Sequence, residues 1–456
     1  MSLIISVSGL RGVVGETLTP DVVVRYLAAF AETLPDGPIV LTRDGRATGP
    51  MIVDAARSSL AALGRRVLDA GPAATPTTGV LVRDLKAAGG VQISASHNPA
   101  EYNGLKLFGG DGRVIPGEAG AGVRDRYEAI SRGEASPTWV AHHKLGRAEA
   151  LEDATSAHLR LVESIVDVER VRSKQFRVLL DANHGAGAVA GGPLLERLGC
   201  EVTVLGATPD GLFDHTPEPT AENLVDVGKR VTDAGAVVGF CQDPDADRLA
   251  LIDETGRYVG EEYTPAVCVD HVLRTLAARG ESGPVVTNCS TSRMTQDLAE
   301  RHGVPFYHAA VGEANVVDKM LDVGAVVGAE GNGGVIDPRV GLVRDSLVGM
   351  ALVLDAMAAR ELPLSSLVDE LPRYAIHKAK VPVDRGKIAA ALDALQSRFP
   401  KATASRLDGL RLDWHEERKW LLVRASNTEP IVRLFCEAPS AEDAEATANA
   451  AAAVLA

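Results

Sequence analysis

The stretch Pro38–Asp44, with the sequence PIVLTRD, begins the pattern that decides the fold class. This apolar run is followed by a polar turn, a helix-like stretch that ends near Leu68, and a second strand. The same order returns between Arg177 and Val202, and again between Pro284 and Pro305. Alternating strands and helices are typical of α/β units, and a unit that occurs three times indicates three related domains. The sequence therefore predicts an α/β protein.

The length of the chain also requires several domains, because a single hydrophobic core stops growing well below 456 residues. From about Ala375 short strands dominate, until an alanine-rich helix at 441–455. We expect three related α/β domains with mixed sheets, followed by a smaller α+β C-terminal domain around one central cleft. The predicted boundaries are 1–148, 149–253, 254–368 and 369–456.

Ser96 follows the apolar run 90–93 and precedes His97 and Asn98-Pro99, which stop a regular strand. A serine at a strand tip, with Lys106 shortly after it, is suited to be a nucleophile, because reactive groups often lie in loops held by rigid strands. On its own, the segment favours a polar turn whose side chains bond their own backbone. Three further motifs favour the nucleophile.

The first motif places Asp243, Asp245 and Asp247 at alternate positions after the apolar run 236–240. Three close carboxylates repel one another, and a hard divalent cation with oxygen ligands relieves that repulsion. An acidic surface turn is the simpler alternative. An EF-hand loop is excluded, because Arg248 stands where the calcium loop requires glycine and the flanks are predicted strands. The motif predicts a Mg²⁺ or Mn²⁺ site in a loop between strands.

The second motif is the turn 424–430, RASNTEP, with Arg433 three residues beyond it. Guanidinium forks match phosphate oxygens, and hydroxyl and amide donors complete such a site. A hairpin with a solvated arginine is the alternative. The third motif, 328–334, is a glycine-rich loop carrying Glu330 and Asn332, which lets backbone approach a ligand. A flexible linker has a similar composition.

These motifs in this order resemble the α-D-phosphohexomutase superfamily, the phosphoglucomutase/phosphomannomutase family, over essentially the whole chain. The resemblance begins at 8–12, SGLRG, continues through 43–46, RDGR, and ends with the phosphate turn. The motifs SASHNP at 94–99 and DPDADR at 243–248 are the specific ones. The resemblance implies an isomerase that interconverts hexose 6-phosphate and hexose 1-phosphate through a phosphoserine and a sugar 1,6-bisphosphate.

The resemblance also implies a role for each site residue. Ser96 would carry the phosphoryl group, and Lys106, Arg11 and His97 would supply proton transfer and positive charge. Magnesium would be held by Ser96, Asp243, Asp245 and Asp247. Arg248 would contact the sugar or the moving phosphoryl group, and Glu330 and Asn332 would read sugar hydroxyls. The phosphate that is not reacting would be held by Arg424, Ser426, Asn427, Thr428 and Arg433.

One departure concerns the glycine loop, which in the common bacterial form of the family contains a serine and a histidine. Here the stretch 329–334 reads AEGNGG, so a role of that histidine cannot be transferred. The variant, with AVGEANVV at 310–317, is similar to archaeal-type phosphoglucosamine mutases. We expect glucosamine phosphate as the substrate, with phosphomannomutase or phosphoglucomutase activity as the alternative.

Composition restricts the remaining function classes. The 61 acidic and 47 basic residues give a formal charge of −14, which argues against nucleic acid or an acidic membrane as partner. Five dispersed cysteines without metal-like spacing indicate a reducing, cytoplasmic location. From the sequence we expect neither a signal peptide nor a membrane-spanning run. A small-molecule sugar phosphate is the expected partner of a monomer or homodimer.

Two rival functions share some of these features. A metal-dependent phosphatase with a serine nucleophile would explain the serine, the cation and the anion turn, but not the sugar loop or a separate phosphate clamp. A non-catalytic sugar-phosphate sensor would be favoured by loss of the serine or of a metal carboxylate. Neither loss occurs in this sequence.

Overall fold

The computed structural model describes residues 3–6, 9–425 and 431–455. The chain forms two compact units. Unit 1 comprises residues 1–271 and 332–368, and unit 2 comprises residues 272–331 and 369–456. In the part of the chain that is described, no helix is both long and apolar enough to cross a membrane.

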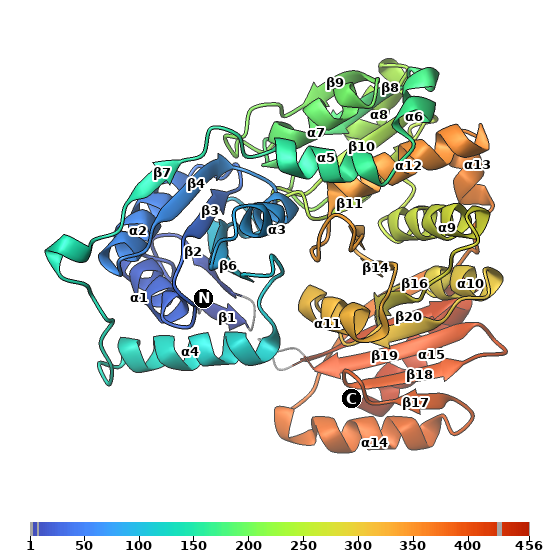
Figure 1. Cartoon of the computed structure of the whole chain (residues 1–456). Coiled ribbons are helices and arrows are strands. Elements are labelled where there is room, and N and C mark those ends of the chain that lie inside the picture. Colours follow the sequence, from blue (N-terminus) through green and yellow to red (C-terminus); the bar gives the residue numbers. More distant parts are fainter. Residues whose placement is uncertain (1–2, 7–8, 426–430, 456) are drawn as a thin grey trace. The chain divides into compact units, whose positions relative to one another are not determined.

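Unit 1 begins with a seven-stranded sheet in the order β1-β2-β6-β5-β3-β4-β7 (Figure 1). Its strands are β1 (Ile4–Ser6), β2 (Gly9–Val13), β3 (Ile39–Arg43), β4 (Val67–Pro72), β5 (Gly89–Ile93), β6 (Tyr102–Gly109) and β7 (Ala148–Ala150). The accompanying helices are α1 (Pro20–Ala31), α2 (Gly49–Ala62), α3 (Thr75–Asp84), α4 (Gly117–Ser131) and the 3-10 turn η1 (His142–Lys144).

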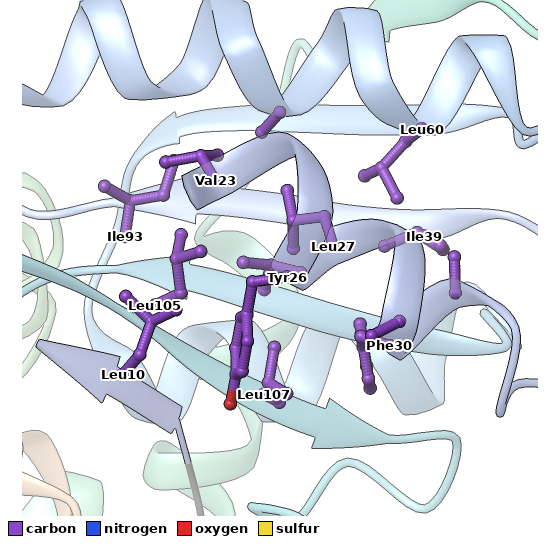
Figure 2. Close-up of a cluster of buried hydrophobic side chains, with 14 of the residues drawn as sticks. Leu10, Val23, Tyr26, Leu27, Phe30, Ile39, Leu60, Ile93, Leu105 and Leu107 are labelled. Atoms are coloured by element: carbon purple, nitrogen blue, oxygen red, sulfur yellow. The ribbon is translucent and has the colours of Figure 1, made fainter. Parts of the chain in front are cut away.

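Alternation along β3 divides the core of this sheet into two layers. Ile39 and Leu41 join the cluster formed with α1, α2 and α4, whereas Val40 joins a second cluster with residues of α3. Successive side chains of a strand point to opposite faces, so both faces of β3 are covered. Figure 2 shows the first cluster, in which Leu27 and Phe30 of α1 face the sheet. Leu27 is fully buried, and truncating such a leucine to alanine typically costs about 2–5 kcal/mol.

The second sheet of unit 1 has the order β11-β10-β8-β9. Its strands are β8 (Arg177–Asp181), β9 (Glu201–Leu205), β10 (Val238–Gln242) and β11 (Leu249–Asp253). Its accompanying helices are α5 (Ser156–Ser164), α6 (Val168–Lys174), α7 (Gly187–Arg197) and α8 (Val225–Asp233). The later segment of unit 1 contributes β15 (Gly334–Ile336), α12 (Ser346–Arg360) and most of α13 (Leu364–Asp369).

Unit 2 contains a parallel core in the order β13-β12-β14 and an antiparallel sheet in the order β16-β20-β19-β18-β17. The first comprises β12 (Val285–Asn288), β13 (Phe306–Ala309), β14 (Val327–Glu330), α10 (Met294–Arg301) and α11 (Glu313–Val323). The preceding helix, α9 (Tyr263–Ala278), begins in unit 1 and ends in unit 2. The second comprises β16 (Ala375–Pro382), η2 (Arg385–Lys387), α14 (Ile388–Arg398), β17 (Thr403–Ser405), β18 (Leu410–Trp414), β19 (Lys419–Ala425), β20 (Ile431–Ala438) and α15 (Ala441–Leu455).

The predicted repeat is confirmed by the strand order. Three parallel cores, β5-β3-β4, β10-β8-β9 and β14-β12-β13, have the same arrangement. Even a local turn recurs at the end of the central strand of each core. There the side-chain oxygens of Asp44, Asp181 and Asn288 each accept a hydrogen bond from the backbone N–H two residues later. The fold class, three α/β domains and a C-terminal domain with an antiparallel sheet, is therefore as predicted.

The glycine-rich segment differs from the prediction of a loop, because its first residues belong to a strand. Residues 327–330 form β14, which pairs in parallel with β12, so the loop proper is confined to 331–333. A Cβ on Gly328 would lie 2.2 Å from Met320 Sδ on α11. Gly328 thus allows a helix to lie close to the strand, which outweighs the weak strand preference of glycine.

Candidate active site

Ser96 lies in the loop between β5 and β6, as the sequence predicts, and its side chain is buried. Its φ angle of +50° puts it in the left-handed region, which few residues other than glycine adopt. Ser94 Oγ accepts the Ser96 N–H at 2.8 Å and donates to Asp44 Oδ2 at 2.6 Å. The unusual backbone of Ser96 is therefore held from the end of β3.

Arg46 fixes the rest of this loop. Its guanidinium donates to the carbonyl oxygens of Ser96, Pro99 and Tyr102 at 2.6, 2.6 and 3.1 Å, and to that of Asn98. It also forms a buried ion pair with Asp44 at 3.1 Å. Burial raises the pKa of Asp44 to about 6, although Arg46 and the Ser94 hydroxyl oppose that shift. One buried arginine thus holds four backbone carbonyls of the loop.

The three aspartates lie in the loop between β10 and β11, which form an antiparallel pair. All three side chains are fully buried, and one oxygen of each lies within 4.8 Å of the others. Ser96 Oγ donates to Asp243 Oδ2 at 2.7 Å, so the first and second repeats meet at this hydrogen bond. Ala246, between two of the aspartates, has a φ of +55°.

In both Asp245 and Asp247, one carboxylate oxygen accepts hydrogen bonds from protein groups and the other has no hydrogen-bond partner among the described residues. Asp245 Oδ2 accepts from Thr75 Oγ1 at 2.6 Å and Lys106 Nζ at 3.1 Å. Asp247 Oδ2 accepts from Lys106 Nζ at 2.8 Å and Arg344 at 2.6 Å. Asp245 Oδ1 and Asp247 Oδ1 are buried and have no hydrogen-bond partner among the described residues. Because buried oxygens without partners are costly, this set of carboxylates fits a hard divalent cation.

The charges of the three carboxylates are unequal. Burial and the charges of Asp245 and Asp247 raise the pKa of Asp243 well above its usual value. Burial opposes ionisation of the other two, but Lys106 lowers the pKa of Asp245 and Arg344 lowers that of Asp247. Two of the three are thus held ionised by neighbouring cations, while Asp243 accepts from the serine hydroxyl.

His97 and Arg11 also lie near the serine. His97 Nδ1 is 3.4 Å from Ser96 Oγ, and Arg11 donates to Asn98 Oδ1 at 3.1 Å. Burial, together with the charges of Arg248 and Arg11, lowers the pKa of His97 to about 3. At neutral pH the imidazole is therefore uncharged and supplies no positive charge, and a pKa this low also makes it a weak base.

Arg248 follows the aspartates directly and has few ties to the protein. Its backbone N–H donates to Asp243 Oδ1 at 3.1 Å, while its guanidinium lies 3.9 Å from Glu218 Oε1. The Nε atom is buried and has no hydrogen-bond partner within the described ranges. This guanidinium could bind an anionic ligand.

Glu330 ends β14 in unit 2 and is buried. Its Oε1 accepts from Asn288 Nδ2 at 2.7 Å and from the Gly312 N–H at 3.2 Å. Asn332 belongs to unit 1, where its Oδ1 accepts from the Gly334 N–H at 3.3 Å. The two residues assigned to one sugar loop are therefore held by different local networks.

The predicted phosphate turn is described in part. Arg424 on β19 and Arg433 on β20 are directly paired in register. Arg424 lies 3.1 Å from Asp408 Oδ2, which also accepts the Val311 N–H at 3.1 Å. The Nε atoms of both arginines are buried without a partner among the described residues, which suits an anion site. Ser426, Asn427 and Thr428 lie outside the described residues.

Sequence reasoning missed several groups that hold these site residues. Thr75, Arg344, Asn288 and Asp408 each contact a predicted site residue, and none lies in a recognised motif. Thr75 and Asp245 are 170 positions apart in the chain, and Arg344 and Asp247 are 97 apart. No local sequence pattern indicates such a pair. The repeat predicts where the loops lie, but not which distant residues contact them.

Profiles of four protein-family domains match almost the entire chain. They describe phosphoglucomutase/phosphomannomutase alpha/beta/alpha domain I at residues 3–134, domain II at 156–256, domain III at 261–374 and the C-terminal domain at 379–454.

Individual relatives and a solved structure agree with these matches. A phosphoglucomutase/phosphomannomutase of Thermococcus kodakarensis is 36% identical over 444 residues, covering 96% of this chain and 94% of the relative. A probable phosphoglucosamine mutase of Methanopyrus kandleri is 33% identical over 442 residues, with 96% and 94% covered. The crystal structure of a phosphoglucomutase/phosphomannomutase family protein from Burkholderia thailandensis superimposes with a TM-score of 0.82 at 25% identity, covering 99% of this chain and 96% of that one.

Proposed function

We propose that this chain, which belongs to the phosphoglucomutase/phosphomannomutase family, interconverts glucosamine 6-phosphate and glucosamine 1-phosphate. As a member of that family it is an isomerase of the phosphohexomutase type. The choice of glucosamine rests on the glycine loop AEGNGG and on relatives named probable phosphoglucosamine mutase. One of these relatives is 33% identical to this chain. Glucose or mannose phosphate is the alternative, because a relative with 36% identity is named phosphoglucomutase/phosphomannomutase.

The observation that carries the proposal is the hydrogen bond of 2.7 Å between Ser96 Oγ and Asp243 Oδ2. It brings the one candidate phosphoryl carrier to a carboxylate cluster in which two buried oxygens lack partners. Phosphoryl transfer depends mainly on positioning and on neutralising the charge of the moving group. A serine beside a cation site supplies both requirements.

In the proposed reaction, phosphorylated Ser96 first transfers its phosphoryl group to the free hydroxyl of a sugar monophosphate. The Ser96 Oγ–P bond breaks, a P–O bond to the sugar forms, the proton of the sugar hydroxyl ends on Ser96 Oγ, and a sugar 1,6-bisphosphate results. The other phosphoryl group then passes to Ser96 Oγ, and the product leaves with its phosphate at the other position. Bound at Asp243, Asp245 and Asp247, Mg²⁺ would supply Lewis-acid polarisation of the serine phosphate.

Proton transfer in this scheme is assigned to His97. When the Ser96 hydroxyl attacks the bisphosphate, its proton needs an acceptor, and His97 Nδ1, which is uncharged at neutral pH but a weak base because of its lowered pKa, lies 3.4 Å away. Lys106 is less suited to act as a base, because Asp245 and Asp247 hold its ammonium at 3.1 and 2.8 Å. Lys106 and Arg11 would instead offset the charge of the phosphoryl group.

Substrate recognition is assigned to residues with separate local supports. Glu330 would accept hydrogen bonds from sugar hydroxyls, and its fixed Oε1 keeps the carboxylate in one orientation. Arg424 and Arg433 would hold the phosphate that is not reacting, together with Ser426, Asn427 and Thr428. Arg248 would contact the sugar or the moving group, and Asn332 would add an amide contact to the sugar.

The test is isomerisation of glucosamine 6-phosphate, glucose 6-phosphate and mannose 6-phosphate, each supplied separately with Mg²⁺ and a trace of the matching 1,6-bisphosphate. Phosphorus NMR follows formation of the 1-phosphate. A preference for glucosamine phosphate supports the proposal, whereas a preference for another hexose replaces the sugar and keeps the mechanism. Release of inorganic phosphate would indicate a phosphatase, and binding without turnover would indicate a sensor.

A further inference from the structure

The segment Arg344–Ser346, at the start of α12, contacts the aspartate loop from a part of the chain to which the sequence analysis assigns no role. Its three side chains have three different partners. Arg344 donates to Asp247, Asp345 caps the helix, and Ser346 donates to a backbone carbonyl of the loop. All three residues are buried.

Arg344 determines how Asp247 uses its two oxygens. Its NH2 donates to Oδ2 at 2.6 Å, and Lys106 Nζ donates to the same oxygen at 2.8 Å. Oδ1 is buried and has no hydrogen-bond partner among the described residues, and its ion-pair contact with Arg248 Nε is long, at 4.0 Å. Two fixed cations on one side of the carboxylate leave the other oxygen directed away from them, as a ligand for a third cation requires.

Ser346 supports the same loop through its backbone. Its hydroxyl donates to the Ala246 carbonyl at 2.6 Å and accepts from Gln242 Nε2 at 2.8 Å. Ala246 has a φ of +55°, a conformation that persists only where the surroundings hold it. The loop is thus held at Ala246 and at the adjacent Asp247 by residues two positions apart in the chain.

Asp345 makes this support rigid. Its Oδ1 accepts from the N–H groups of Leu347 and Val348 at 2.9 and 3.3 Å, which caps α12. Its Oδ2 accepts from His158 Nε2 at 2.7 Å, and His158 Nδ1 lies 2.9 Å from Thr77 Oγ1. Arg344 therefore extends from a helix terminus that is tied to α3 and α5.

We propose that Arg344 is a positioning residue for the divalent cation, acting through Asp247. The inference rests on the metal site of the proposed function. Mutating a group that orients a metal ligand without touching the metal typically lowers metal affinity by about 10- to 100-fold. Arg344 holds the ligand through its NH2 group, from the start of a capped helix.

A simple electrostatic argument predicts the opposite change in metal affinity when Arg344 is removed. A guanidinium close to a metal site repels the cation, so its removal should tighten metal binding if orientation were unimportant. The direction of the change therefore separates the two accounts. Lysine at this position keeps the positive charge but loses the planar fork, which separates charge from geometry.

The experiment measures Mn²⁺ binding to the purified, metal-stripped full chain by electron paramagnetic resonance, without sugar. The variants are R344Q and R344K, with R339Q as matched control, because Arg339 lies in the same segment and its guanidinium donates to Asp337. We expect R344Q to raise the Kd for Mn²⁺ by about 10- to 100-fold, R344K to give an intermediate Kd, and R339Q to match the parent protein.

Unchanged or tighter Mn²⁺ binding by R344Q would overturn the proposal. If R344Q does not fold, S346A provides the second test, because it removes only the hydroxyl bound to Ala246 and should weaken Mn²⁺ binding in the same direction. Tight binding by folded S346A and R344K together would then contradict the inference. The readout needs no turnover, so absence of isomerase activity would count against the proposed function and leave the result for Arg344 standing.

Discussion

The Ser96 loop and the aspartate loop follow equivalent strands of two repeats, β5 and β10, but are held in different ways. Both contain a residue with a positive φ, +50° at Ser96 and +55° at Ala246. The Ser96 loop is held through its backbone, by the carbonyl bonds to Arg46. The aspartate loop is held mainly through its side chains, by Lys106 and Arg344.

The difference follows from the charge of each loop. The buried part of the Ser96 loop is neutral, since its one acidic residue, Glu101, is exposed. Such a neutral loop presents carbonyl dipoles, and a single buried guanidinium can bind several of them. An acidic loop must first be neutralised, since like charges in a buried site repel. The repeated strands place the two loops equivalently, and the residues within each loop decide which support is needed.

The largest expected effect comes from removing the hydroxyl of the neutral loop. Ser96→Ala should lower turnover by on the order of 10⁴-fold or more, because no phosphoryl carrier remains. The measurement is 1-phosphate formation at saturating Mg²⁺, with the thermal midpoint as a check of folding. Ser94→Ala is the control: it removes a support of the loop but should still allow Ser96 to be phosphorylated. Normal turnover by Ser96→Ala would contradict the mechanism.

The support of the neutral loop is tested by Arg46→Met. The substitution leaves Asp44 buried without its cation and frees four carbonyls, so the free energy of unfolding should fall by about 3 kcal/mol or more. Denaturant titration measures this change. Arg132→Met, at an exposed pair with Glu134, should alter it by less than about 0.5 kcal/mol. Equal effects of the two variants would show that Arg46 does not hold the loop.

The charge of the acidic loop is tested by Asp245→Asn. One ligand charge is lost, so the Mg²⁺ concentration for half-maximal activity should rise by on the order of 100-fold. A Mg²⁺ titration of the rate gives the value, and Asp226→Asn on the exposed start of α8 serves as control. An unchanged Mg²⁺ requirement would mean that the loop is not the metal site.

The smallest effect concerns pH and His97. Burial lowers the pKa of His97 to about 3 in the folded protein, so between pH 6.5 and 3 the unfolded chain binds one more proton than the folded one. Stability therefore falls as the pH falls, by about 2 kcal/mol between pH 7.5 and 5. Comparing denaturant midpoints of the metal-free parent and His97→Asn isolates this contribution. Parallel pH dependences would show that the imidazole titrates normally.

Local patterns predicted the positions of both loops correctly, because strand periodicity and turn residues are encoded within short segments. Ser96, Asp243, Asp245 and Asp247 follow strands that the apolar runs already indicated. The three repeated strand, turn and helix signals were sufficient for the fold class, since local propensity and hydrophobic pattern indicate the same elements.

The supports of the loops were not predictable in the same way. Thr75 and Arg344 reach their aspartates only after distant segments pack together, and a sequence shows no partner for either. The strand at Gly328 was missed for a related reason: its pairing with β12 and its close packing against Met320 are tertiary effects. Local composition indicated a loop there instead.

The positive φ of Ser96 restricts the evolutionary history of the nucleophile. Threonine also carries a hydroxyl that can accept a phosphoryl group, and it differs from serine by one methyl group. Branching at Cβ makes a left-handed backbone unfavourable, so threonine would strain the turn that Arg46 and Ser94 maintain. The chemically mildest exchange is thus disfavoured by backbone geometry, so Ser96 is required for its small side chain as well as for its hydroxyl.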